Sequence, residues 1–263
     1  MALVARKRVG RLDRPAIDGV LVREMTNFSS YWRSTTFSST VEPTIYLLAF
    51  GFGFSSLVSQ VAGYDYVEFV GTGTVATAVL FASVFPSMFG TFVKYSFQHT
   101  SDALLAAPVD TEEIVTGEAL WMAIRAGTYG CVPLLVAMLF GLEPRIDMLV
   151  VPLIAFISGF GWAAFGIMIA GLLKSIDNFN YVTSTVITPT FLVAGTFFPL
   201  SGLPQWAQIA GNFNPLHHTV ELVRHASFGW EGWTDVGHVG AIVLFGLVMW
   251  RFAIKALERK LIT

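Results

Sequence analysis

Charged residues are scarce in this chain of 263 residues. Asp, Glu, Lys and Arg make up 13% of it, 54% is hydrophobic and the mean hydropathy is +0.63, whereas a soluble domain usually carries about 25% charged residues. Between Arg33 and Lys94 there is no basic residue, and the only acids are Glu42, Asp65 and Glu68. Such long uncharged stretches are typical of membrane-spanning helices and argue against an ordinary soluble domain.

Other absences narrow the function further. Cys131 is the single cysteine and has no partner for a disulfide bond, and the net charge of −2 gives no reason to expect a nucleic-acid partner. The first 35 residues hold no apolar core followed by a cleavage site, so we expect no cleaved signal peptide. The chain also has no G-x-x-x-x-G-K-[ST] phosphate loop, so we do not expect it to bind a nucleotide by that route. It has no Ser, His and Asp in the order of a catalytic triad, so we do not predict an enzyme.

Six apolar stretches are long enough to be membrane spans. A hydrocarbon core of ~30 Å requires about 20 residues of helix. The sequence therefore predicts an all-α integral membrane protein with spans at 43–62, 69–93, 119–142, 148–173, 181–198 and 236–250. Within the fourth span, Ala155, Gly159 and Ala163 recur at every fourth position, which predicts a seam where another helix packs closely.

The basic residues predict the orientation of these spans. Seven of them precede the first span and four follow the last, while Lys94, Arg125 and Lys174 flank the connections between spans two and three and spans four and five. Only Arg145 and Arg224 fall on the opposite side. Because cytoplasmic loops carry the excess of Lys and Arg, both termini are expected in the cytoplasm of a bacterium, with the chain in its cytoplasmic membrane.

Residues 15–32 are expected to form an amphipathic helix that lies in the cytoplasmic interface of the membrane. Asp18, Arg23 and Asn27 fall off its apolar stripe. The stripe itself consists of Ile17, Val20, Leu21, Met25, Phe28 and Trp32. The alternative is a soluble amphipathic helix packed on a partner. We divide the chain into a cytoplasmic N-terminus with this helix (1–35), a transmembrane domain (36–258) and a cytoplasmic tail (259–263).

The connection between spans two and three has its own helix signals. Ser101 or Asp102 is suited to cap a short helix at about 100–110 that Pro108 stops, and Asp110 followed by Glu113 predicts a capping box for the third span. The short helix presents small apolar side chains that favour a groove on a partner protein, Ala103, Leu104 and Leu105. The alternative is an ordinary turn that packs on its own spans.

Two groups of ionisable residues are candidates for function. Glu118 and Arg125 are seven residues apart and share one face of the third span, although both are near its cytoplasmic end, where snorkelling to the surface would account for them. His217, Glu221 and His225 share a helix face at a spacing of four. Zinc favours such sets, but this spacing matches no known hydrolase pattern, so we do not predict a metal site.

Three stretches of the chain resemble the type-2 ABC exporter permease family. They are "SDALLAAPVDTEEIVTGE", which starts at Ser101, "AGTFFPLSGLPQWAQIAGNFNPLHHTVELVR", which starts at Ala194, and "VEPTIYLLAFGFGF", which starts at Val41. The similarity is greatest to the NodJ-type lipooligosaccharide permeases and their drug-exporter relatives, and it extends from about residue 15 to residue 260.

The resemblance implies a coupling helix at Ser101–Pro108 that contacts a separate ATPase, and short re-entrant outer helices at about 199–229. It implies a translocation path or outer gate lined by Phe197, Phe198, Pro199, Trp206, Asn214 and Pro215, with Glu221 and Arg224 as further functional charges. Because six spans make half a transporter, the family's architecture also implies a second copy of this chain or a similar permease.

The expected function is therefore that of the transmembrane subunit of an ATP-driven exporter. Its expected cargo is amphipathic, either a lipid-linked saccharide or a hydrophobic drug. The expected partners are membrane lipid, a second permease and a dimer of ATPase subunits that bind ATP and magnesium, because this chain is expected to bind no cofactor. Two alternatives remain, namely a secondary transporter and an intramembrane enzyme that uses His217, Glu221 and His225.

Overall fold

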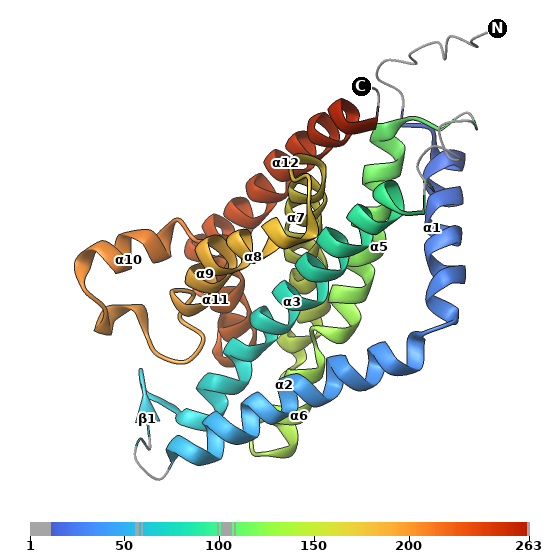
Figure 1. Cartoon of the computed structure of the whole chain (residues 1–263). Coiled ribbons are helices and arrows are strands. Elements are labelled where there is room, and N and C mark those ends of the chain that lie inside the picture. Colours follow the sequence, from blue (N-terminus) through green and yellow to red (C-terminus); the bar gives the residue numbers. More distant parts are fainter. Residues whose placement is uncertain are drawn as a thin grey trace, which may run out of the picture.

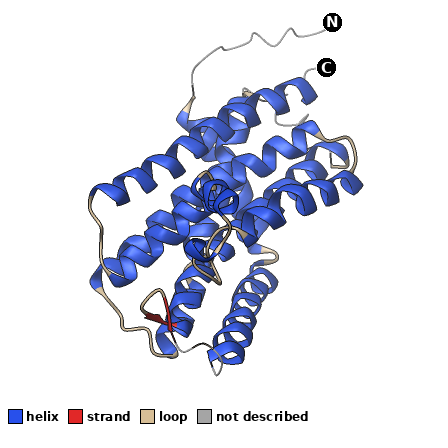
Figure 2. Cartoon of the chain, turned by 90° about the vertical axis from the view of Figure 1, so that its left-hand side faces the viewer, coloured by secondary structure: helices blue, strands red, loops and turns tan. Residues whose placement is uncertain are grey.

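Helices make up almost all of the structure (Figures 1 and 2). The computed structural model describes residues 12–55, 58, 60–98, 100, 107 and 109–261. Its helical bundle consists of α2 (Trp32–Ser55), α3 (Tyr66–Ser96), α5 (Thr111–Tyr129), α7 (Val151–Leu172) and α12 (Trp233–Leu261), and α1 (Arg14–Ser29) packs against α5. The predicted all-α class is confirmed apart from a small antiparallel hairpin of β1 (Gln60–Val61) and β2 (Tyr64–Asp65).

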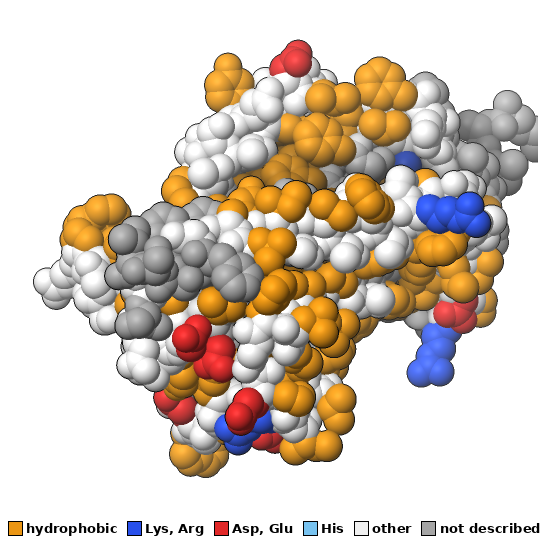
Figure 3. Space-filling view, turned by 90° about the horizontal axis from the view of Figure 1, so that it is seen from below, with side chains coloured by type: hydrophobic (Ala, Val, Ile, Leu, Met, Phe, Trp, Pro, Cys, Tyr) orange, Lys and Arg blue, Asp and Glu red, His pale blue; other side chains and the backbone are white. Residues whose placement is uncertain are grey.

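Four stretches of the described chain are long and apolar enough to cross a membrane. They are Tyr66–Ser96, Thr111–Leu139, Ile146–Leu172 and Trp233–Leu261. The second stretch joins α5 to α6 (Val132–Leu139), and the third joins the 3₁₀ turn η1 (Ile146–Val150) to α7. These stretches overlap the second, third, fourth and sixth predicted spans. Figure 3 shows hydrophobic side chains over much of the middle of one face, as expected of a surface in contact with lipid.

The first predicted span is wrong at both ends. It was expected at 43–62, but α2 begins at Trp32 and ends at Ser55, and the hairpin occupies Gln60–Asp65. The helix starts earlier because its hydroxyl side chains are satisfied within it: Thr36 Oγ1 donates to the carbonyl of Trp32 at 2.8 Å, and Thr44 Oγ1 donates to that of Thr40 at 2.6 Å.

The fifth predicted span does not form one regular helix. Its residues belong to a series of short elements, η2 (Ile176–Asn178), α8 (Phe179–Val182), the π-helical η3 (Thr183–Ile187) and α9 (Thr188–Leu192). The helical series ends at Leu192 rather than at Phe198, because the chain turns at Gly195, which has a φ of +88°, and Pro199 has no N–H to donate to a preceding turn. Side chains of a later helix bond the carbonyls of Ala194 and Gly195. The chain then continues through η4 (Leu200–Gly202), α10 (Gln205–Asn212) and α11 (Pro215–Phe228) before it enters α12.

Helix α7 is the centre of the bundle, since it packs against α3, α5, α11 and α12. The predicted seam of small residues is confirmed, because Ala155, Gly159 and Ala163 are all buried. A methyl group added at Gly159 would overlap the Cβ atom of Ala126 on α5. The glycine therefore brings these two helices close together, as small residues do between helices in membranes.

Tertiary contacts define two ends of the bundle. At the end that we call the N/C end, the side chain of Tyr95 donates to the carbonyl of Ala170 at 2.7 Å, and Lys260 donates to that of Leu173 at 3.2 Å. These bonds join the C-terminal ends of α3, α7 and α12. At the opposite end, the hairpin end, the ring of Tyr64 stacks on Phe228 with 4.0 Å between ring centroids.

The N/C end also contains the start of α5. The predicted capping box is confirmed there, because the backbone N–H of Asp110 donates to Glu113 Oε2 at 2.8 Å and the Asp110 side chain caps the helix. The other carboxylate oxygen of Glu113 accepts the backbone N–H of Asp13 at 2.8 Å, which attaches the start of α1. The predicted coupling-helix residues 101–106 and 108 lie outside the described residues.

Helix α1 turns sharply away from α2 and lies alongside α5 (Figure 1). Part of its predicted apolar stripe packs inward: Val20 is buried against Gly117, and Phe28 lies edge-on to the ring of Trp121. Met25, in contrast, is 63% exposed. The helix is thus docked on the bundle by one side and leaves apolar side chains on its surface, an arrangement compatible with the interfacial position that its sequence predicts.

Candidate functional site, a cavity between two polar clusters

A cavity of about 560 Å³ lies between α2, α3, α5 and the segment 183–197. This volume falls in the range of about 300–1,000 Å³ that ligand pockets usually have. Its lining on α3 extends from Thr74 to Pro86, twelve positions or about 18 Å of helix. A cavity of that length covers more than half of a hydrocarbon core about 30 Å thick.

One wall of this cavity is aromatic. The rings of Phe85, Phe81, Phe191 and Phe197 follow one another with centroid separations of 5.6, 5.5 and 5.6 Å, so that α3 and the segment after α9 share a continuous row. Such rings offer a large apolar contact area. The predicted path residue Phe197 is therefore in the cavity lining.

A second wall carries hydroxyl groups, chiefly from α2. Ser34 and Ser38 are four residues apart, as are Thr35 and Ser39, so all four occupy one face of the helix and all line the cavity. From α3, Thr77 adds a further hydroxyl. A hydroxyl that donates its proton to the backbone still has two acceptor lone pairs, so this wall is suited to polar groups of a ligand.

Arg125 on α5 also lines the cavity, and its guanidinium group is unusually placed. The residue is only 7% exposed. Its Nη1 donates to Met122 Sδ at 3.6 Å, and its Nε is buried without a hydrogen-bond partner. Its Cζ lies 5.2 Å from the centroid of the Phe28 ring. Within the described chain no carboxylate is close enough to pair with it. The prediction that it snorkels to the surface is wrong, because helices α1 and α2 cover it.

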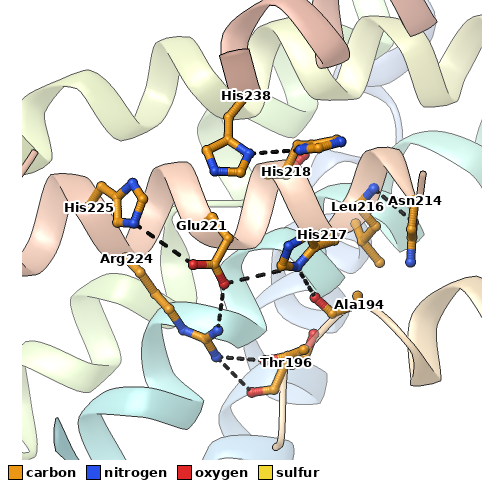
Figure 4. A network of polar contacts seen from close by, with 12 residues as sticks. Ala194, Thr196, Asn214, Leu216, His217, His218, Glu221, Arg224, His225 and His238 are labelled. Carbon is orange, nitrogen blue, oxygen red and sulfur yellow. Dashed lines mark hydrogen bonds and ion pairs between the residues drawn. The ribbon is translucent and has the colours of Figure 1, made fainter. Parts of the chain in front are cut away.

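At the hairpin end, α11 holds the turn that follows α9 (Figure 4). Arg224 Nη2 donates to the carbonyl oxygen of Gly195 at 2.6 Å, and its Nη1 pairs with Glu221 at 3.1 Å. The Cζ atom of Arg224 lies 3.6 Å from the centroid of the Phe69 ring on α3, a close cation–π contact. The ion pair forms because Glu221 and Arg224 are three residues apart on one helix and therefore lie side by side.

The turn held by Arg224 forms the hairpin-end wall of the cavity. The backbone of Thr196 lies directly on Gly73 of α3, where a methyl group would overlap it, and Thr196 Oγ1 is 3.4 Å from Thr77 Oγ1. The next residue is Phe197, which belongs to the aromatic row. The predicted functional charges Glu221 and Arg224 are thus structurally connected to the cavity without lining it.

The other predicted gate residues have different surroundings. Asn214 caps α11, since its Oδ1 accepts the N–H of Leu216 at 2.9 Å and its Nδ2 donates to the carbonyl of Thr190 at 2.7 Å, and Pro215 is the first residue of that helix. Phe198 is 40% exposed and Trp206 is 72% exposed on α10. Pro199 precedes η4. None of these five is among the residues that line the cavity in the described structure.

The histidines of α11 have structural partners. His217 Nδ1 lies 3.1 Å from the carbonyl oxygen of Ala194, and His218 Nδ1 lies 2.7 Å from Nδ1 of His238 on α12 (Figure 4). His225 bonds Asp235 of α12. Burial lowers the pKa of His217, and burial together with the neighbouring histidines lowers the pKa of His218 to about 4.

These histidines do not form a metal site. Over the ranges that the structure describes, no group of three or more His, Cys, Asp or Glu side chains is arranged to hold a metal ion. The hydrogen bond between His218 and His238 requires one nitrogen to carry a proton and the other to accept it, which is compatible with neutral rings. The arrangement thus fastens α11 to α12 and to the turn after α9.

A second polar cluster lies at the N/C end and joins three helices. Glu118 of α5 accepts from Arg23 of α1 at 2.9 Å, from Lys94 of α3 at 3.0 Å and from Thr91 at 3.0 Å. Glu24 of α1 pairs with Lys94 at 2.8 Å and also with Arg23. Both carboxylates are nearly inaccessible to water, so the prediction that Glu118 snorkels to the surface is wrong.

Sequence reasoning missed most of this cluster. It identified Glu118 but placed Arg23 on the polar face of a helix at the membrane surface and gave Glu24 and Lys94 no pairing role. The available signal was the presence of two acids and two bases in segments of very low charge, where an unpaired charge would be expensive to bury. Which acid meets which base depends on the packing of α1, α3 and α5, which the spacing within each segment does not reveal.

Comparison with known proteins agrees with this architecture. A family model described as "ABC-2 type transporter" matches residues 17–228, which include the cavity, the polar cluster at the N/C end and α11. The chain belongs to the ABC-2 type transporter family. Members of this family are membrane subunits of transporters and not enzymes themselves, and they work with an ABC ATPase.

Individual relatives share most of their length with this ABC-2 type chain. It is 30% identical to Nodulation protein J of Rhizobium leguminosarum bv. trifolii over 236 residues, 88% of this chain and 90% of the relative. It is 28% identical to Nodulation protein J of Neorhizobium galegae, with 96% and 99% covered. It is 23% identical to the inner membrane transport permease YadH of Escherichia coli strain K12, with 93% and 95% covered.

Proposed function

We propose that this chain is the transmembrane permease subunit of an ATP-driven exporter and that the cavity between α2, α3 and α5 is part of its translocation path. The observation that carries the proposal is the two-sided lining, in which a row of Phe rings faces a helix that presents hydroxyl groups. An amphipathic molecule matches both sides, because its apolar part contacts the rings and its polar part the hydroxyls. A lipid-linked saccharide is the cargo that we favour, with a hydrophobic drug as the alternative.

Six spans account for the membrane domain in this proposal. They comprise α2, the four long apolar stretches and the short segment Ile176–Leu192. Helices α10 and α11 form the re-entrant outer pieces, and the hairpin end faces outward. The basic residues near both termini then lie in the cytoplasm, as the positive-inside rule requires, in the cytoplasmic membrane of a bacterium.

Energy for transport comes from a separate subunit in this proposal. An ABC ATPase dimer binds ATP and magnesium and contacts the coupling helix predicted at Ser101, Asp102, Ala103, Leu104, Leu105 and Pro108, while this chain binds no nucleotide. A second copy of the chain, or a similar permease, completes the path. The cluster of Arg23, Glu24, Lys94 and Glu118 supports this arrangement, because it ties α1, α3 and α5 together beside the connection that contains the coupling helix.

The proposal is tested by narrowing the cavity. Ala82 lines it from α3, so Ala82→Trp fills space between the aromatic row and α2. Leu244→Trp is the matched control, because Leu244 is 63% exposed on α12 and does not line the cavity. Each variant is reconstituted in liposomes with the cognate ATPase, and the ATP-dependent movement of a fluorescent acylated saccharide across the bilayer is measured.

We expect Ala82→Trp to reduce ATP-dependent transport at least about tenfold, a barrier increase of about 1.4 kcal/mol. Leu244→Trp should transport as the unmodified chain does. Equal transport by both variants would contradict the assignment of the cavity as the path, and transport at full rate without the ATPase would contradict the whole proposal.

A further inference from the structure

Arg125 differs from the partly buried Arg23 and the buried Arg224 in having no anionic partner within the described chain. Arg23 pairs with Glu24 and Glu118, and Arg224 pairs with Glu221 and a backbone carbonyl. Arg125 has only the sulfur of Met122 and the ring of Phe28. A buried charge is costly unless it is paired and hydrogen-bonded. The chain therefore maintains, at the cavity, a cation whose charge its own described side chains do not neutralise.

The surroundings of Arg125 are built to receive a ligand group. Tyr129, one turn further along α5, also lines the cavity, and its hydroxyl is held by Thr36 Oγ1 at 2.7 Å. Ser34 lines the same region from the first turn of α2 and donates its proton to the carbonyl of Tyr31 at 2.9 Å, so its oxygen faces outward as an acceptor. The guanidinium is thus fixed by Phe28, flanked by ordered hydroxyls and open to the cavity.

We propose that Arg125 binds an anionic oxygen group, a phosphate, sulfate or carboxylate, on the amphipathic molecule that occupies the cavity. This rests on the proposed function in which the cavity is the path. The guanidinium has several N–H donors in a planar fork that matches such groups in a bidentate manner. The apolar part of the ligand extends from Arg125 along the row of Phe rings, and its hydroxyl or amide groups face α2.

The position of Arg125 in the cavity determines which molecules can occupy it. Arg125 lies beside the middle of the α3 lining, since the neighbouring Ala126 packs on Val79, and Phe197 lies towards the hairpin end. An amphiphile with its anionic group at Arg125 can place its apolar chain along the row of Phe rings, within a lining that extends about 18 Å along α3. A neutral molecule of the same shape fills the same space but leaves Arg125 unpaired, so the site discriminates by charge.

The test uses a matched pair of amphiphiles, 1-oleoyl-lysophosphatidic acid and 1-monoolein, which share an acyl chain and a glycerol and differ in the phosphate. Binding of each to the purified full-length chain in a neutral detergent is measured by isothermal titration calorimetry. We expect the anionic member to bind at least about tenfold more tightly, and Arg125→Gln to remove that preference. Arg33→Gln is the control, because Arg33 is an exposed arginine at the start of α2 and should keep the preference.

A second variant covers the case in which Arg125→Gln does not fold. Ser34→Glu places a carboxylate beside the cavity at an exposed position in the first turn of α2, where an acidic side chain is well tolerated. It gives Arg125 an internal partner and should lower the affinity for lysophosphatidic acid relative to that for monoolein, so that the preference is lost. Ser34→Gln is its uncharged counterpart; it also loses the Ser34 hydroxyl, but it should keep the preference for lysophosphatidic acid over monoolein.

The proposal is overturned if the unmodified chain shows no preference for the anionic amphiphile, or if Arg125→Gln and Ser34→Glu both retain it. Because binding is measured without the ATPase, this outcome is independent of transport. In liposomes with the ATPase, ATP-dependent movement of lysophosphatidic acid would identify the anion as that of a cargo, and retention of the bound molecule during ATP hydrolysis would identify it as a resident lipid. Absence of ATP-dependent movement for every amphiphile would refute the proposed function and leave the anion site standing.

Discussion

The cluster at the N/C end supports a prediction that can be worked out from its charges. Arg23, Lys94, Glu24 and Glu118 together carry two positive and two negative charges, and Glu118 contacts both cations and Thr91. Glu118→Gln keeps the shape of the side chain but leaves one uncompensated positive charge among groups that are largely shielded from water. Breaking a buried ion pair by removing one partner usually costs about 3–5 kcal/mol.

We expect Glu118→Gln to lower the melting temperature of the purified chain by about 6–12 °C, since about 3 kcal/mol is lost and each kcal/mol corresponds to about 2–4 °C in a chain of this size. The double variant Glu118→Gln with Lys94→Gln restores neutrality, because Arg23 and Glu24 still pair. It should therefore be less destabilised than the two single changes added together, by about 0.5–3 kcal/mol.

The assay is thermal unfolding followed by intrinsic fluorescence in one detergent, with Glu143→Gln as a control for an exposed carboxylate. The control should melt as the unmodified chain does. Strict additivity of the Glu118 and Lys94 changes, with a coupling energy near zero, would refute the reasoning, because it would mean that the two side chains do not compensate each other in the folded protein.

Two further predictions concern the hairpin end. Arg224→Ala removes the hydrogen bond to the Gly195 carbonyl and the contact with Phe69. It should therefore lower the melting temperature by several degrees and reduce transport. The control Arg251→Ala changes an exposed residue on α12 and should alter neither the melting temperature nor transport in the same assays. Because the pKa of His218 in the folded chain is about 4 and an unfolded histidine titrates near 6.5, the free energy of unfolding should hold above pH ~6.5 and fall as the pH is lowered towards 4. Melting temperatures between pH 7.5 and 5 should therefore decrease less in His218→Gln, and parallel decreases would contradict the assignment.

Some features followed from the sequence because they depend on local properties. Four of the predicted spans overlap long apolar helices, since hydropathy over about 20 residues is a sum over neighbours along the chain. The capping box of Asp110 and Glu113 and the packing of Gly159 are likewise local patterns. The expectation that Arg224 and Phe197 belong to one functional region came from the resemblance, and the contacts through Gly195 and Thr196 give it a physical basis.

Other features were decided by the tertiary structure alone. Hydropathy misplaced α2, because its Ser and Thr side chains count as polar although they bond their own helix backbone. It carried the fifth span too far, because hydropathy does not register the turn at Gly195, whose φ is +88° and whose carbonyl Arg224 of α11 holds.

The tertiary structure alone also decided how the buried charges are paired. Glu118 and Arg125 look alike in the sequence, because both are ionisable residues on the same face of an apolar helix. Packing gives Glu118 two cations from other helices and gives Arg125 an open cavity. Pattern along the chain determined that this is a membrane protein and where its four long apolar helices lie. The pairing of a buried charge depends on which distant side chains lie within about 4 Å of it, and only the folded bundle decides that.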